Sequence, residues 1–295
     1  MSLIDELTAG GPVVLDGAWG TELQARGLAL GEIPDFWNLE HPDRVEQVAR
    51  SYVDAGSDII LTNTFRANRI ALAGHADVSK LDQANQAGVE ISKRAAGNRA
   101  RVFASIGPSG KLLLNEQVDE ASLRVSFEHQ AQALAAGGAD GIVVETMTDL
   151  EEARFAIEAA CATGLPVVAC MVYDSGKNKD RTMMGAKPEQ VAEALTRAGA
   201  DVIGANCGNG IDGYIPICGR LASATDRPIW IKANAGLPTL VEEKVAYHTT
   251  PEEFVSHVDD LIDAGASFIG GCCGTTPAFI EALRSHIDAR VSGPR

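Results

Sequence analysis

Three of the six cysteines stand in surroundings that suit chemistry. Cys207 and the vicinal pair Cys272 and Cys273 lie among glycines, at points where short apolar runs end. Thiolates are strong zinc ligands, and a catalytic zinc site has three protein ligands and one open position. We therefore predict that these three cysteines together hold one catalytic zinc ion.

The vicinal pair can bind one ion only under a geometric condition. Neighbouring side chains of a regular strand point to opposite faces, so the backbone must leave strand geometry at Cys272 and Cys273. The surrounding glycines, Gly270, Gly271 and Gly274, supply that freedom. A structural zinc site usually has four protein ligands in closely spaced pairs, and no C-x2-C pair occurs in the sequence. The pattern favours a catalytic site.

The other candidate groups predict less chemistry. Cys161, Cys170 and Cys218 fall inside predicted elements and are interpreted as buried structural residues. None of the six histidines lies in a motif at a strand end. Two other functions remain open. A zinc hydrolase would normally use histidine and carboxylate ligands, and a thiol sensor or zinc store would use the same cysteines without catalysing a reaction.

Alternating strands and helices must position these residues. Strands are predicted where short apolar runs rich in β-branched residues occur, at 13–16, 58–62, 102–106, 142–145, 167–171, 202–205, 229–232 and 268–270. Helical spacing of apolar residues predicts helices at 43–55, 120–136, 150–162, 188–198 and 251–264. Four of these helices end in a similar phrase, AGSD, GGAD, AGAD or AGAS, whose glycine suits a helix C-cap before the next strand.

Eight such units in 295 residues predict a single-domain (β/α)8 TIM barrel over residues 1–295, in the α/β class. A doubly wound sheet is the alternative, but no G-x-G-x-x-G turn follows the first strand. In a barrel the reactive face is formed by the C-terminal ends of the strands. Most predicted strands end there in a polar residue or a cysteine followed by small residues.

The net charge of -15 disfavours nucleic acid and anionic membranes as partners. The N-terminal residues lack the pattern of a secretory signal, and no apolar run approaches the length needed to span a bilayer. Six cysteines without a signal indicate reduced thiols instead of a disulfide scaffold. We therefore expect a cytoplasmic enzyme.

Several phrases together resemble one known family. They are Asp16-Gly17-Ala18-Trp19-Gly20-Thr21, Thr62-Asn63-Thr64-Phe65, Gly204-Ala205-Asn206-Cys207, Asn234-Ala235-Gly236-Leu237-Pro238 and Gly270-Gly271-Cys272-Cys273-Gly274-Thr275-Thr276-Pro277. In this order, from about residue 12 to about residue 287, they resemble the homocysteine S-methyltransferase family. That family includes the homocysteine-binding module of cobalamin-dependent methionine synthase.

The resemblance implies the roles of several residues. Cys207, Cys272 and Cys273 would hold Zn²⁺, and the homocysteine thiolate would be the fourth ligand and attack the methyl donor to form methionine. Asn234 would lie near the metal and could occupy the open position before the substrate binds. Glu145 would bind the substrate amino group, although it could instead cap the helix that follows. The remaining candidates for substrate binding are Asp16, Gly17, Thr21 and Asn63; for Asp16 and Asn63 ordinary turn chemistry is the alternative.

The methyl donor is the least defined element. Because the chain ends just after the eighth predicted helix, we expect the donor to come from outside it. A methyl-corrinoid (methylcobalamin) on a separate protein is favoured, and S-methylmethionine or a betaine is the alternative. The loop at 174–187 is basic and could meet a donor or a partner, or be only a solvated loop. Trp19, Ser109 and Lys232 depart from the family pattern near the expected mouth.

Overall fold

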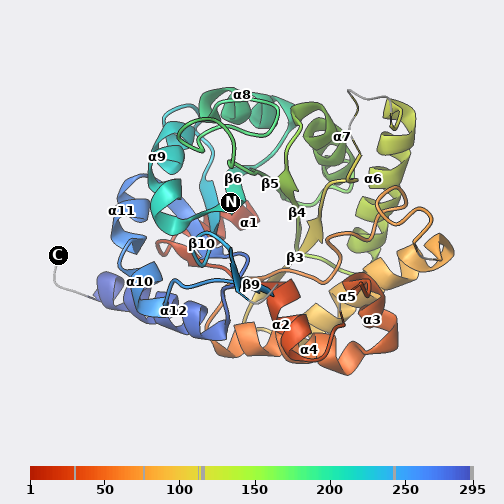
Figure 1. Ribbon diagram of the computed structural model, residues 1–295, viewed down its shortest axis with the longest axis horizontal. Coiled ribbons are helices and arrows are strands. Elements are labelled where there is room, and N and C mark those ends of the chain that lie inside the picture. The colour runs from red at the N-terminus through yellow and green to blue at the C-terminus, as the bar shows by residue number, and fades with distance from the viewer. Residues whose placement is uncertain (30, 76, 112, 114–116, 242–243, 293–295) are drawn as a thin grey trace.

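The computed structural model describes residues 1–292 apart from residues 30, 76, 112, 114–116 and 242–243. An inner ring of strands is surrounded by helices (Figure 1). The eight strands of this ring are β1 (Val13–Val14), β2 (Ile59–Ile60), β3 (Arg101–Ile106), β4 (Gly141–Met147), β5 (Val167–Met171), β6 (Val202–Gly210), β7 (Ile229–Asn234) and β10 (Ala266–Gly271).

All ladders between these strands are parallel, in the order β1-β10-β7-β6-β5-β4-β3-β2. A parallel bridge between Leu15 and Ile59 joins the two ends of this order. The amide of Asp58 also donates to the carbonyl of Val14 at 2.7 Å. The sheet therefore closes on itself, and the predicted (β/α)8 TIM barrel is confirmed.

The helices connect successive strands and cover the outside of the barrel (Figure 1). The principal ones are α4 (Pro42–Asp54), α5 (Leu81–Ala96), α6 (Glu120–Ala136), α7 (Leu150–Cys161), α8 (Pro188–Ala198), α9 (Ile211–Ala222), α10 (Pro251–Val255), α11 (Val258–Asp263) and α12 (Pro277–Ser292). Shorter helices are α1 (Leu3–Thr8), α2 (Trp19–Ala25), η1 (Pro34–Phe36), α3 (Trp37–Glu40) and η2 (Val78–Lys80). No helix of the described chain combines the length and the apolar character that a membrane span requires.

The glycines of the four repeated phrases end helices as predicted. Gly56, Gly138, Gly199 and Gly265 have φ between 88° and 110°, a backbone conformation that glycine adopts without steric cost. Each turn leads the chain directly into the next strand of the barrel.

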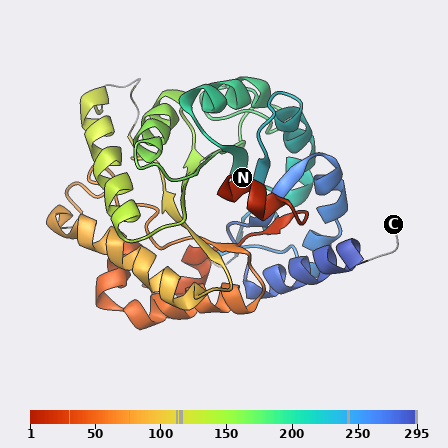
Figure 2. The same ribbon diagram turned by 180° about the vertical axis from the view of Figure 1, so that it is seen from behind.

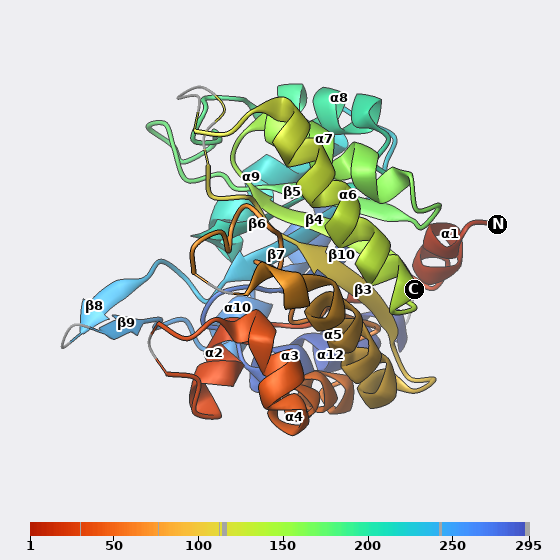
Figure 3. The same ribbon diagram turned by 90° about the vertical axis from the view of Figure 1, so that its right-hand side faces the viewer.

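The two ends of the barrel differ. Helix α1 lies over the centre of the ring when the molecule is seen from behind (Figure 2), and its Ile4 packs with the residues inside the barrel. The hairpin of β8 (Thr239–Val241) and β9 (Lys244–Ala246) projects from the opposite end (Figure 3). That end carries the C-terminal ends of the strands, where the reactive face was predicted.

Apolar side chains from all eight strands fill the inside of the barrel. Phe103, Trp230 and Phe268 are its largest members, and the Trp230 ring lies 5.3 Å from that of Phe268 and 6.3 Å from that of Phe103. Burial of such residues is the main driving force for folding. This packed interior lies directly below the residues at the mouth of the barrel.

Some predicted boundaries were wrong. The ladders of β1 and β2 have only two residues each, although the predicted runs had four and five. The predicted helix 251–264 is two helices, because the Ser256 hydroxyl donates to the Glu253 carbonyl and the His257 amide bonds to Phe254, three residues back. Strand β6 extends past the predicted end at residue 205 and includes Cys207.

Candidate active site

The thiols of Cys207, Cys272 and Cys273 meet at the C-terminal mouth of the barrel. Their sulfur atoms all lie within 4.8 Å of one another, and the sulfurs of Cys207 and Cys273 are 3.8 Å apart. Thiolates about 2.3 Å from a tetrahedral ion lie about 3.8 Å from each other, so this spacing fits three ligands of one zinc ion. All three residues are half-buried.

A strained backbone directs Cys207 toward the other two thiols. Its φ is 62°, in the left-handed region that residues with a Cβ rarely adopt, and Gly208 follows with φ 67°. The hydroxyl of Tyr214, which is fully buried in α9, donates a hydrogen bond to the Cys207 carbonyl. This bond fixes the peptide that carries the strain.

The vicinal pair lies just beyond β10, which ends at Gly271. The Cys272 amide donates to the Ala233 carbonyl at 2.6 Å, and the Cys273 carbonyl accepts from the Ala235 amide at 2.9 Å. Gly274 then turns with φ 81°, and a Cβ there would lie 2.3 Å from the ring of Tyr247. The prediction that the chain leaves strand geometry at this pair is confirmed.

Asn234, the last residue of β7, lies between Ala233 and Ala235, whose backbone groups bond to this cysteine pair. It is 3 % exposed, and its Oδ1 is buried without a hydrogen-bond partner among the described residues. A buried amide oxygen without a partner costs free energy, and a cation would supply one. The three thiols therefore fit a metal site, and Asn234 Oδ1 is a buried acceptor in the residue between the two that bond to the cysteine pair.

Without a metal the thiols hold their protons. The contact with Cys207 and burial raise the pKa of Cys272 to about 12. The contact with Cys272 lowers the pKa of Cys207, but the contact with Cys273 and burial raise it to about 11 overall. A metal that binds these groups as thiolates must displace their protons.

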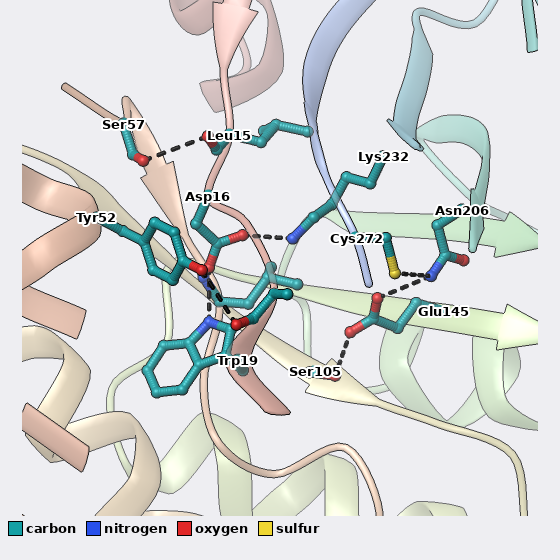
Figure 4. A network of polar contacts seen from close by, with 12 residues as sticks. Leu15, Asp16, Trp19, Tyr52, Ser57, Ser105, Glu145, Asn206, Lys232 and Cys272 are labelled. Carbon is teal, nitrogen blue, oxygen red and sulfur yellow. Dashed lines mark hydrogen bonds and ion pairs between the residues drawn. The ribbon is translucent and has the colours of Figure 1, made fainter. Parts of the chain in front are cut away.

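Asn206 connects the thiols to a buried carboxylate (Figure 4). Its Nδ2 donates to Glu145 Oε2 at 3.1 Å and to Thr146 Oγ1 at 2.7 Å, and lies 3.9 Å from the sulfur of Cys272. Ser105 donates to the other oxygen of Glu145 at 2.6 Å. Burial raises the pKa of Glu145, and the charge of Lys232 opposes this. Glu145 does not cap α7, because Asp149 does so.

Asp16 forms a buried ion pair with Lys232 at the other side of the mouth (Figure 4). Its second oxygen accepts from the Trp19 indole and from the Leu61 amide, each at 2.7 Å. Burial alone would lower the pKa of Lys232, but the charges of Asp16 and Glu145 raise it. Asp16 thus already has a full set of donors from the protein.

The other predicted substrate residues have packing contacts. A Cβ on Gly17 would lie 2.9 Å from Thr275 Oγ1 and from the Tyr52 ring, and Thr21 Oγ1 accepts from the Gly274 amide at 3.4 Å. These contacts join the first strand-end turn to the cysteine loop. The Asn63 amide donates to Pro34 and Asn38, and the structure shows no contact between it and the thiols.

Sequence reasoning missed Asn206, Tyr214 and Lys232 as site residues. Asn206 directly precedes Cys207, and Lys232 departs from the family pattern, so both carried a signal that could have been used. Tyr214 carried none. Of the other cysteines, Cys170 and Cys218 are buried and Cys161 half-buried, and none belongs to the thiol group.

Comparisons with known proteins show the family of this chain. A family model described as homocysteine S-methyltransferase matches residues 13–287. The methionine synthase of Mycobacterium tuberculosis is 31% identical over 294 residues, and that of Mycobacterium leprae is 28% identical over 291 residues. Each match covers 93% of this chain and 24% of the relative, so the chain spans about a quarter of the length of these curated relatives.

Solved structures show the same barrel. The metallated form of the homocysteine methyltransferase MmuM from Escherichia coli has a TM-score of 0.77 and 24% identity, covering 93% of this chain and 96% of that one. Its oxidized form has a TM-score of 0.78 and 23% identity, covering 96% and 97%. At this identity the likeness shows the shared fold.

Proposed function

The chain belongs to the homocysteine S-methyltransferase family, and on that premise we propose that it methylates the thiol of homocysteine to form methionine, in a reaction that depends on zinc. The observation that carries this proposal is the meeting of Cys207, Cys272 and Cys273 at the barrel mouth. Zinc is favoured because it prefers thiolates in a tetrahedron and can keep one position open for a substrate.

Zinc bound there would lower the pKa of the substrate thiol, so that homocysteine is held as the nucleophilic thiolate at neutral pH. Glu145 would receive the substrate ammonium group, since the only donors that it has within hydrogen-bond distance among the described residues are the neutral groups of Ser105 and Asn206. The unpartnered Oδ1 of Asn234 supports its assignment to the open side of the metal. Asp16, Gly17 and Thr21 would act by shaping the mouth, and a role for Asn63 in substrate binding stays a prediction.

The transfer itself forms one bond and breaks one. The thiolate sulfur attacks the methyl carbon in line with the leaving group, a sulfur–carbon bond forms, and the electron pair of the broken bond leaves with the donor. The thiol proton has already left when the thiolate forms. The protein's contribution is to fix sulfur and methyl carbon in this alignment.

For the donor we favour a methyl-corrinoid presented by another protein, since the curated relatives are named methionine synthases. The basic loop 174–187 supports docking of a partner near the mouth, because the Asn209 amide binds the carbonyls of Tyr173 and Lys179 and so holds this loop close to Cys207. S-methylmethionine or a betaine is the alternative.

The test is methionine formation by the zinc-loaded, reduced protein with homocysteine and each donor in turn: methylcobalamin, S-methylmethionine and glycine betaine. We expect methionine with one of them, and loss of at least about 99% of the rate in Cys272→Ala, because the metal would lose a ligand. Cys170→Ala is the matched control, since Cys170 is a buried cysteine outside the group. No methionine with any donor, together with no binding of homocysteine by the folded, zinc-loaded protein, would overturn the proposal.

A further inference from the structure

The buried ion pair of Asp16 and Lys232 has no part in the proposed chemistry. Asp16 is fully buried and Lys232 is 2 % exposed. Burying two charges is expensive even when they pair, and such pairs often contribute little to stability. Their position beside Glu145, at the mouth of the barrel, points to a role in the site (Figure 4).

Glu145 is the second buried carboxylate at this mouth, and unlike Asp16 it has no cationic partner among the described residues. Asp16 pairs with Lys232, whereas no cationic side chain of the described chain lies within 4.0 Å of the Glu145 carboxylate. Figure 4 shows the Lys232 ammonium group between the two carboxylates and directed to Asp16. With the Lys232 ammonium group paired with Asp16, the Glu145 carboxyl group has only the neutral donors of Ser105 and Asn206 within hydrogen-bond distance among the described residues.

We propose that Asp16 is a positioning residue that holds Lys232 away from Glu145, so that Glu145 stays free to bind the ammonium group of an amino-acid thiol. The inference rests on the proposed function and deepens it by stating what makes the site select a substrate with an amino group. Without Asp16, the Lys232 ammonium group would compete with the substrate ammonium group for Glu145. The ion pair with Asp16 prevents this competition.

The charges explain why the arrangement needs Asp16. A buried ammonium group cannot remain unpaired at low cost, so Lys232 must have an anionic partner. Both carboxylates already act electrostatically on Lys232. If Asp16 is made neutral, Glu145 is the buried carboxylate that remains for Lys232. An asparagine at position 16 would also have only one accepting oxygen for the three donors that the Asp16 carboxylate now satisfies.

A purely structural role for the pair is the rival explanation. Asp16 binds the Trp19 indole and the Leu61 amide as well as Lys232, so its loss will loosen the mouth in any case. The two explanations differ in the double variant. If Lys232 is only a structural partner, removing it as well as the charge of Asp16 adds damage. If Lys232 is a competitor, removing it restores the free carboxylate.

The experiment is isothermal titration calorimetry of the zinc-loaded protein with L-homocysteine and with 4-mercaptobutanoate, which lacks only the amino group. The measured quantity is the ratio of the two dissociation constants. We compare the wild type with Asp16→Asn, Asp16→Asn/Lys232→Met and Glu145→Gln, and follow the fold of each by circular dichroism.

In the wild type we expect homocysteine to bind at least about tenfold more tightly than the analogue. Asp16→Asn should lose this preference, as should Glu145→Gln, and the double variant should regain most of it. If Asp16→Asn does not fold, the double variant alone decides, since a preference close to that of the wild type supports the inference.

Loss of the preference in a folded double variant, or its full retention in Asp16→Asn, would overturn the inference while homocysteine binding by the wild type stands. Absence of homocysteine binding in the zinc-loaded wild type would instead overturn the proposed function, on which the inference rests.

Discussion

The sulfur atoms of Cys207 and Cys273 lie 3.8 Å apart, although the two residues are 66 positions apart in the chain. One thiol is carried by β6 and the other by the loop after β10, so barrel closure and two irregular backbones are needed to bring them together. Such convergence needs a physical reason, and a shared metal provides one.

The strained peptide at Cys207 predicts a role for Tyr214. Removing its hydroxyl in Tyr214→Phe leaves the Cys207 carbonyl without its donor, so the left-handed conformation should relax. We expect zinc affinity to fall roughly tenfold, as is typical for partners that orient a ligand. Competition with a chromophoric chelator measures this. Tyr173→Phe is the control, since the hydroxyl of Tyr173 is also buried but has no hydrogen-bond partner in the described structure. Equal effects in the two variants would contradict the assignment.

We predict that Asn206 links the three thiols to Glu145, the carboxylate proposed to bind the substrate amino group. Asn206→Leu removes the donor to Glu145 and the contact with Cys272, so homocysteine affinity should fall by about 10-fold to 100-fold. Asn85→Leu serves as the control, because this buried amide in α5 donates to the carbonyls of Ala67 and Leu81 and accepts from Gln130 at 3.5 Å, and none of these residues belongs to the thiol group. Both variants should lose stability in urea, but only the first should lose affinity in calorimetry. A similar loss of affinity in both would reduce Asn206 to a structural residue.

The features that could be predicted from the sequence are those fixed by residues close together in the chain. The helices Glu120–Ala136 and Pro188–Ala198 have the bounds that local periodicity predicted, since spacing and capping are properties of nearby residues. The short ladders of β1 and β2 were not predicted, because pairing with the neighbouring strands decides where each strand ends.

The same distinction holds for the site. The meeting of the three cysteines could be predicted because strand ends share one face of a barrel. The ion pair of Lys232 and Asp16 spans 216 positions and could not, since it depends on where two side chains point inside the closed barrel. For the same reason the predictions for Asp16 and Asn63 did not foresee that their polar groups bind other parts of the protein.

The buried carboxyl group of Asp35 predicts a pH effect on stability. Burial raises its pKa from 3.8 to about 6, although the Arg66 amide opposes this. The native state therefore binds the proton more tightly than the unfolded state, and the unfolding free energy contributed by Asp35 falls as pH rises through this window. Urea denaturation should show the stability of Asp35→Asn, relative to the wild type, growing by roughly 1 to 2 kcal/mol between pH 5 and pH 7.5. A constant difference would show that Asp35 does not titrate in this way.

Alanine substitutions at two glycines should have opposite effects on the stability of the protein. A Cβ at Gly204, in β6, would lie 2.3 Å from the Trp230 carbonyl oxygen, so Gly204→Ala should destabilise the barrel by at least about 2 kcal/mol. Gly219 lies within α9 with nothing within 4 Å of a Cβ, and Gly219→Ala should stabilise the protein by about 0.5 to 1 kcal/mol. Thermal unfolding of both variants tests the packing. Destabilisation by both would contradict the open space at Gly219.

The central claim is that one zinc ion joins the three cysteines to the substrate thiol. The most direct test is zinc content together with the zinc-edge X-ray absorption spectrum, recorded with and without homocysteine in the wild type and in Cys207→Ala. We expect about one zinc per chain, a gain of one sulfur ligand when homocysteine is added, and loss of the metal in the variant. Absence of zinc from the reduced wild type, or a spectrum that homocysteine leaves unchanged, would contradict the claim.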